Sequence, residues 1–148
     1  MIATVQRVKK SNVSVEKKII ADIKIGLNIF LGIMKNDDKS DAEYLAKKIS
    51  KLRIFNDKNF NMNLSIKDVK GSLLVISQFT LCADLKNGNR PSFTKAAEPC
   101  RAKKLYKYFI NELKKFDLEV QSGKFGSIMN VSILNDGPAT FILDSENV

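Results

Sequence analysis

The sequence predicts an α+β fold in a single domain over residues 1–148, with a mostly antiparallel sheet. Short runs rich in β-branched residues occupy both ends of the chain, and two stretches with helical spacing of apolar residues lie between them. The 148 residues suffice for one ordinary hydrophobic core, and no internal repeat or linker-like segment divides them.

Four β-rich runs begin the chain, at 2–8, 12–16, 19–25 and 27–33. Lysine pairs and a Ser-Asn dipeptide separate the first three, which indicates strands joined by tight connections. The fourth run, LNIFLGI, is mostly apolar, so we expect it to form a buried strand.

Two amphipathic helices are predicted in the middle of the chain. Ser40 followed by Glu43 fits a capping box, and the apolar spacing after it predicts a helix over 41–53. Pro99 suits the first turn of a second helix, which we place at about 99–116. The buried face of that helix would carry Leu105, Phe109, Leu113 and Phe116.

Two polar segments, 56–63 and 84–99, are predicted as loops, and the second is long enough to suggest a functional role. Basic residues in this second loop and in the helix after it would form a phosphate-binding patch, although such a run also fits a solvated surface. These residues are Lys86, Arg90, Lys95, Arg101, Lys103 and Lys104.

The run 73–82, LLVISQFTLC, predicts a strand buried on both faces, yet Ser77 and Gln78 interrupt it. A buried hydroxyl or amide without a partner costs a few kcal/mol, so these side chains are either satisfied or used. One interpretation is that they bond to neighbouring backbone at a bulge or strand end. The other is that the strand ends here and places donors at the rim of a pocket, the arrangement an oxyanion hole requires.

The tetrapeptide NDGP at 135–138 separates two predicted strands, 128–134 and 139–144. All four residues are common in turns, so a hairpin connection is the simplest interpretation. The alternative is functional, because an X-Pro bond can be cis at modest cost. Gly137 and Pro138 would then present two carbonyl groups to an ammonium group.

Arg7 shares a strand face with Ala3 and Val5. It either lies among these apolar neighbours, where it needs a carbonyl or carboxylate partner, or extends to solvent.

The composition favours an anionic partner and excludes several catalytic classes. Twenty-five basic residues against sixteen acidic ones give a net charge of +9, for which nucleic acid is the usual partner. The absence of histidine removes every Ser-His or Cys-His nucleophile and the commonest general base.

The two cysteines, Cys82 and Cys100, form neither a zinc-type spacing nor a disulfide framework, so we expect no metal or cofactor and a reduced, cytoplasmic protein. The sequence also predicts no secretory signal and no membrane-spanning segment.

Taken together, SQFTL at 77–81 and NDGPAT at 135–140 closely resemble motifs of the D-aminoacyl-tRNA deacylase family. Other segments resemble that family in the same order over the full length: IATVQRVKKSNVSV, GLNIFLGI, RIFND, GSLLVISQFTL, GNRPSF and SGKFG. The resemblance implies a barrel-like, homodimeric fold. It also implies hydrolysis of the ester that joins a D-amino acid, or glycine, to the terminal adenosine of tRNA, with L-aminoacyl-tRNA spared.

By matching positions, the resemblance implies that Ser77, Gln78, Phe79 and Thr80 line the pocket beside the terminal adenosine and the ester. It further implies that a cis Gly137–Pro138 enters the pocket of the partner subunit and that Arg7 helps to hold it. Lys86, Arg90 and Lys95 are expected to contact the acceptor end of the tRNA.

The chemistry of such an ester is compatible with a chain that has no histidine. The neighbouring ribose hydroxyl and the α-ammonium already activate the carbonyl, so main-chain N–H groups around Phe79 and Thr80 would serve as the oxyanion hole. A second mechanism makes Thr80 a covalent nucleophile, which requires a base that the sequence does not identify. Two other functions stay open: a non-catalytic nucleic-acid-binding protein and a small-ester hydrolase that ignores RNA.

Overall fold

The computed structural model describes residues 1–86 and 88–146. The helices in these ranges are α1 (Lys39–Lys51), α2 (Pro99–Lys114) and a short 3-10 helix, η1 (Phe79–Cys82). The strands are β1 (Ile2–Val15), β2 (Lys18–Ile23), β3 (Gly26–Gly32), β4 (Arg53–Asn56), β5 (Met62–Ser65), β6 (Ser72–Ser77), β7 (Glu119–Ser122) and β8 (Asn130–Asp144). None of the helices in the described ranges has the length and apolar character needed to cross a membrane.

The main sheet has the order β2-β1-β3-β6-β7, and β8 pairs with β1 as well. β1 is antiparallel to β2, β3 and β8, whereas β6 is parallel to both β3 and β7. The parallel pairs follow from the two connections that contain α1 and α2, because a helical crossover returns the chain in the same direction. The N–H of Asp22 on β2 donates to Oε1 of Gln121 on β7 at 2.9 Å, which links the two outer strands into a nearly closed, barrel-like sheet.

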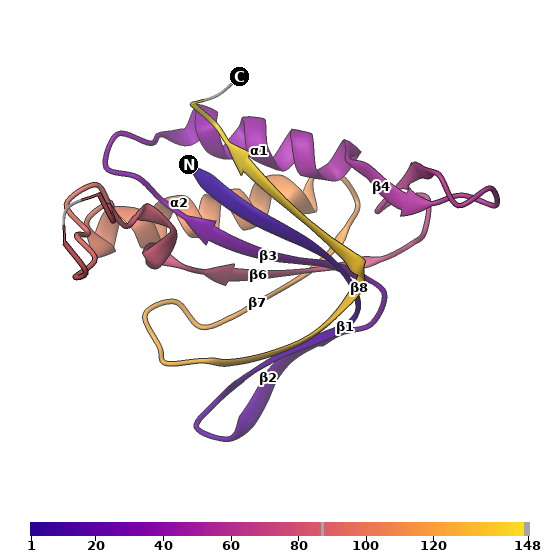
Figure 1. The fold of residues 1–148 in the computed structure, drawn as a ribbon, viewed down its shortest axis with the longest axis horizontal. Coiled ribbons are helices and arrows are strands. Elements are labelled where there is room, and N and C mark those ends of the chain that lie inside the picture. Colours follow the sequence, from indigo (N-terminus) through magenta and orange to yellow (C-terminus); the bar gives the residue numbers. More distant parts are fainter. Residues whose placement is uncertain (87, 147–148) are drawn as a thin grey trace.

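Both α-helices pack on one face of the sheet, as Figure 1 shows. Their buried side chains, among them Leu45 and Phe109, share a core with Val5 and Val75 of the strands. A smaller core lies on the opposite side of the sheet. It is formed by Val8, Val13, Ala21, Ile23, Leu74 and Ile76, with Met129 and Val131 packed against it.

Each end of the chain contributes one long strand where the sequence predicted two. The expected strands 2–8 and 12–16 are both part of β1, and 128–134 and 139–144 both belong largely to β8. The hairpin interpretation of NDGP is therefore wrong. β8 stays paired with β1 on both sides of this tetrapeptide, so that cross-strand pairing determines the local structure in place of the turn-forming residues.

The helix predicted at 41–53 is present as α1, but its N-terminal cap differs from the prediction. Asp38 is the N-cap and accepts the N–H of Ser40 at 2.7 Å, while the carboxylate of Asp41 accepts the N–H of Asp38 at 2.8 Å. The predicted Ser40–Glu43 capping box was therefore wrong, and the observed box, Asp38 and Asp41, begins two residues earlier. Aspartate is as favourable as serine at an N-cap, so the sequence offered both positions. Pro99 begins α2 as predicted.

The segment 56–63 was predicted as a loop, but its two ends belong to the antiparallel hairpin of β4 and β5. The carboxylate of Asp57 accepts the N–H groups of Asn59 and Asn61 and so fixes the tip. β5 alternates apolar and polar residues over only four positions, and its burial does not alternate because Met62 and Asn63 at the tip are both exposed, so the pattern is too short to mark a strand.

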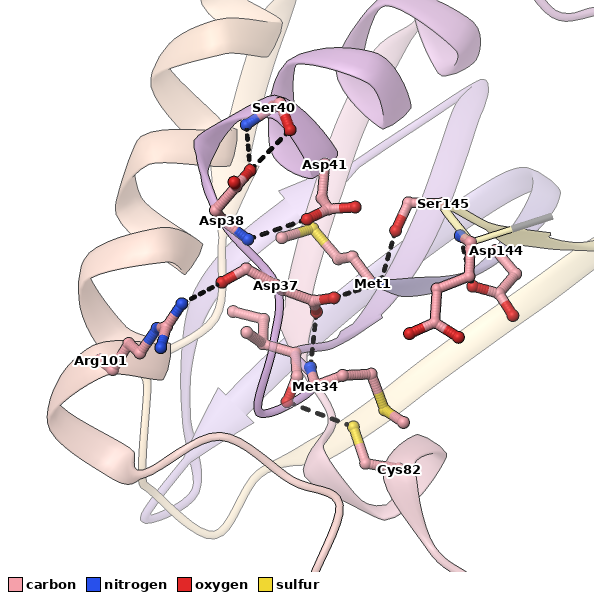
Figure 2. A network of polar contacts seen from close by, with 12 residues as sticks. Met1, Met34, Asp37, Asp38, Ser40, Asp41, Cys82, Arg101, Asp144 and Ser145 are labelled. Atoms are coloured by element: carbon pink, nitrogen blue, oxygen red, sulfur yellow. Dashed lines mark hydrogen bonds and ion pairs between the residues drawn. The ribbon is translucent and has the colours of Figure 1, made fainter. Parts of the chain in front are cut away.

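A buried ion pair fastens the start of β1 to the helical layer. The ammonium group of Met1 lies 2.7 Å from Oδ1 of Asp37 and also donates to Ser145 at 2.6 Å (Figure 2). Burial raises the pKa of Asp37, although the ammonium group and the N–H of Met34 act in the opposite direction. Arg101 of α2 donates to the main-chain oxygen of Asp37 at 2.6 Å, so this network also holds the first turns of α2.

Candidate functional site

The site begins where β6 ends. β6 stops at Ser77, and the chain turns into η1 at Phe79, so the strand predicted over 73–82 is shorter than expected. Ser77 still pairs with Leu31 of β3, and the N–H of Gln78 donates to the main-chain oxygen of Leu31 at 2.8 Å. Ser77 and Gln78 are half-buried at the edge of the core, which answers how two polar residues fit into an apolar run.

At the start of η1, two main-chain N–H groups precede the helical hydrogen bonds. The first bond of η1 joins the N–H of Leu81 to the main-chain oxygen of Gln78 at 3.3 Å, so the N–H groups of Phe79 and Thr80 precede the helical bonds. The side chain of Thr80 accepts a hydrogen bond from the amide of Gln78. The Gln78 side chain is thereby oriented, and the Thr80 hydroxyl lies next to an amide N–H.

A cavity of about 670 Å³ lies beside this strand end. Its walls come from the ends of β3 and β6, from the segment that leads into α2, and from the segment between β7 and β8. Phe79 and Phe93 meet edge to face across its rim, with ring centroids 4.9 Å apart. The site residues predicted from sequence that line this cavity are Ser77, Gln78 and Phe79.

Gly137 and Pro138 lie elsewhere, in an irregularity of β8. Gln6 pairs with Thr140 and Val8 with Asn135, so residues 136–139 face a single residue of β1, Arg7. The Gly137–Pro138 bond is cis, Gly137 has a φ of +123°, and both residues are exposed. These residues do not line the cavity of their own chain.

Arg7 is buried, with 5% of its surface exposed, and has the polar partners that such burial requires. Nε donates to the main-chain oxygen of Asp136 at 3.1 Å and lies 3.3 Å from the Asp136 carboxylate. Nη1 donates to the main-chain oxygen of Ile54 at 2.6 Å and to Oδ1 of Asn56 at 3.1 Å. The guanidinium therefore joins β4 to the β8 irregularity, and the interpretation in which Arg7 extends to solvent is wrong.

The predicted basic loop is exposed and partly neutralised by its own acid. Lys95 forms an ion pair with Asp84 at 3.0 Å, while Lys86 and Arg90 form no ion pair among the described residues. The N–H of Lys86 and the Lys95 ammonium hold the pKa of Asp84 below its usual value. Residue 87 of this loop lies outside the described residues.

Sequence reasoning did not assign most of the cavity wall. Phe93, Phe125 and Met129 line it from segments that are distant in the chain, and nothing in their local pattern marks them as neighbours of Ser77. The available signal was the presence of GNRPSF and SGKFG among the segments that resemble one family. Cys82 is buried and its Sγ donates to the main-chain oxygen of Ile33 at 3.4 Å, as expected of a packing residue, whereas Cys100 is exposed.

The strand-end cavity and the nearly closed sheet define an α+β protein with a site of small-molecule size. The model of the D-Tyr-tRNA(Tyr) deacylase family matches residues 4–144. The chain belongs to this family.

Curated relatives match over nearly their whole length. The D-aminoacyl-tRNA deacylase of Clostridium tetani is 55% identical over 148 residues, with 100% of this chain and 99% of the relative covered. The D-aminoacyl-tRNA deacylase of Thermosipho melanesiensis is 52% identical over 149 residues, with the same coverage.

Two solved structures share the fold. One, described as the c-Myc DNA Unwinding Element Binding Protein, has a TM-score of 0.91 and 36% identity, and the match covers 97% of this chain and 98% of that one. The other, described as a probable eukaryotic D-amino acid tRNA deacylase, has a TM-score of 0.84 at 12% identity and supports the fold alone; this match covers 96% and 97% of the two chains.

Proposed function

We propose that this protein hydrolyses the ester bond of D-aminoacyl-tRNA, releasing the free D-amino acid and tRNA, and that it spares L-aminoacyl-tRNA. The observation that carries the proposal is the strand end at Ser77–Phe79, which borders a cavity in a chain of the deacylase family, with Thr80 next in the chain. Glycyl-tRNA would also be a substrate, because glycine is achiral and has no side chain that a site excluding L-amino acids could reject. The place of action would be the cytoplasm, where aminoacyl-tRNA is used.

The proposed mechanism uses main-chain groups and the RNA itself. The N–H groups of Phe79 and Thr80 would stabilise the oxyanion, and the ribose 2′-hydroxyl would assist the attacking water. The hydrogen bond from the Gln78 amide to the Thr80 hydroxyl supports this mechanism over a covalent one, because an amide N–H cannot accept the hydroxyl proton. Thr80→Ala should therefore retain much of the activity, and complete loss with an intact fold would exclude the main-chain mechanism.

A homodimer would complete the site, with Gly137 and Pro138 of one subunit entering the cavity of the other. Three observations support this arrangement: both residues are exposed, they lie outside the cavity of their own chain, and Arg7 holds the adjoining Asp136. Leu134 and Ile142 flank them on β8 with 59% and 74% of their surfaces exposed, an apolar surface that a second copy would cover. The main-chain oxygens of the cis dipeptide would accept the α-ammonium of the amino acid and exclude an L side chain.

The loop residues Lys86, Arg90 and Lys95 would contact phosphates near the acceptor end of the tRNA. Of the three, Lys86 and Arg90 should contribute most, because Lys95 is paired with Asp84. Joint replacement of Lys86 and Arg90 by glutamine should raise KM for the tRNA substrate. It should also reduce the dependence of KM on salt, because a variant with fewer phosphate contacts releases fewer counterions from the RNA when it binds.

The deciding experiment compares matched D-tyrosyl-tRNA and L-tyrosyl-tRNA as substrates of the purified protein. Rapid loss of the D ester with the L ester retained supports the proposal. Salt-sensitive RNA binding without turnover of either would favour a non-catalytic nucleic-acid-binding protein, and cleavage of free D-tyrosine esters as fast as the tRNA ester would favour a small-ester hydrolase.

A further inference from the structure

Glu98 is the one residue with an ionisable side chain among the described residues that line the cavity. The other walls are apolar or carry neutral hydroxyl, amide and main-chain groups. An acidic residue at this place is unexpected in a protein with a net charge of +9, whose proposed substrate is a polyanion.

The fold makes no use of the Glu98 carboxylate. Glu98 is the N-cap residue of α2, but its side chain makes no capping hydrogen bond, and Pro99 at the next position has no N–H to offer. The usual N-cap side chains are shorter, as with Asp38 on α1. In the described part of the chain, Glu98 forms no side-chain hydrogen bond or ion pair, whereas the nearby acids Asp37 and Asp84 both do.

The end of an aminoacyl-tRNA suits an unpartnered carboxylate. The terminal aminoacyl-adenosine carries an α-ammonium, a ribose hydroxyl and an exocyclic amine, all of which donate hydrogen bonds, and its esterified 3′ position carries no phosphate. A carboxylate accepts such donors strongly and repels phosphate. Basic residues outside the cavity and one exposed acid in its wall would therefore orient the RNA with its phosphate-free end inward.

We propose that Glu98 is a substrate-binding residue that accepts a hydrogen bond from the terminal aminoacyl-adenosine and repels a phosphate at the 3′ position. This inference rests on the proposed function, because it assigns the cavity to that end of the tRNA. Loss of one charge-assisted hydrogen bond at an accessible site corresponds to about a tenfold weaker binding.

The test measures binding by calorimetry, so that it does not depend on turnover. The probes are a non-hydrolysable D-tyrosyl-adenosine with an amide in place of the ester, its N-acetylated form, and adenosine 3′-phosphate. Glu98→Gln is compared with Asp117→Asn, a matched control. Asp117 is exposed beyond the far end of α2, a helix about 24 Å long, and its replacement changes the net charge equally.

Glu98→Gln should bind the amide analogue about tenfold more weakly and adenosine 3′-phosphate more tightly, while Asp117→Asn leaves both unchanged. General damage to the cavity cannot produce shifts of opposite sign. If Glu98→Gln binds the N-acetylated analogue as tightly as wild type does, the α-ammonium is the donor to Glu98. If the replacement weakens binding of the N-acetylated analogue as much as binding of the free amine, the donor belongs to the nucleoside. Unchanged binding of both the amide analogue and the phosphate in Glu98→Gln would overturn the inference.

The outcome for Glu98 is separable from the outcome for the proposed function. Wild-type protein that hydrolyses D-tyrosyl-tRNA while Glu98→Gln binds like wild type would refute only the role of Glu98. Wild-type protein that hydrolyses no D-tyrosyl-tRNA would refute the proposed function whatever the binding data show.

Discussion

Replacement of Arg7 by methionine should destabilise the protein by about 2–4 kcal/mol. Methionine fills similar apolar space but offers no donor, so the buried main-chain oxygen of Ile54 loses its contact at 2.6 Å, worth about 1–3 kcal/mol. The contacts to Asn56 and Asp136 add less, because the Asp136 side chain is 35% exposed and water can replace the guanidinium there. Arg7→Lys keeps the charge but not the fork of donors, so we expect about half of this loss.

Urea unfolding followed by circular dichroism measures the effect of these replacements. At a slope of about 2 kcal/mol per molar urea, Arg7→Met should lower the midpoint by about 1–2 M. Arg53→Met is the matched control, since the hydrogen bonds of Arg53 to the described residues go to the exposed Asn63 of the neighbouring hairpin strand, and it should cost less than about 1 kcal/mol. A loss below about 1 kcal/mol for Arg7→Met would refute the claim that the guanidinium holds β4 and the β8 irregularity together.

Three further predictions follow from the same contacts. Gly137→Val should abolish hydrolysis of D-tyrosyl-tRNA, because a Cβ at φ +123° would lie 2.7 Å from Nη2 of Arg7 and displace the dipeptide; circular dichroism checks that the fold is retained, and unchanged turnover would mean that the dipeptide is only structural. Iodoacetamide at neutral pH should label Cys100, which is exposed, and leave Cys82 intact, because burial raises the pKa of the Cys82 thiol; equal labelling by mass spectrometry would contradict this. Tyr106→Phe should cost about 1 kcal/mol in urea unfolding, because the buried hydroxyl donates to Val75 at 2.7 Å, and an unchanged midpoint would show that this bond adds nothing.

The elements that follow from hydrophobic periodicity were predicted within a few residues. α1, α2 and β3 lie where the sequence placed them, because each buries an apolar face that has its own spacing. The strand breaks were mispredicted, because they were inferred from local polarity. Lys9 and Lys10 are exposed within β1, and the pairing of β1 with its neighbours continues past them.

The candidate site was predicted in part for the same physical reason. The polar pair Ser77–Gln78 was detectable within an apolar run, since unpaired polar groups are costly there. The cavity beside it was not, because its walls, which include Phe79, Phe93 and Phe125, come from distant segments that only the tertiary fold brings together. The partners of Arg7 on β4 were equally invisible in the linear order of residues.

The pairing of β1 with β8 has a consequence for synthesis of the protein. Ile2 and Asp144 are paired residues of β1 and β8, two strands that pair along most of their lengths, so the first strand made must wait for the last one. Until β8 has left the ribosome, one edge of β1 has no partner, and contacts between residues so distant in sequence form slowly. Nascent chains that stop before Asn130 should therefore aggregate, and the time between emergence of β1 and of β8 is when this protein most needs a chaperone.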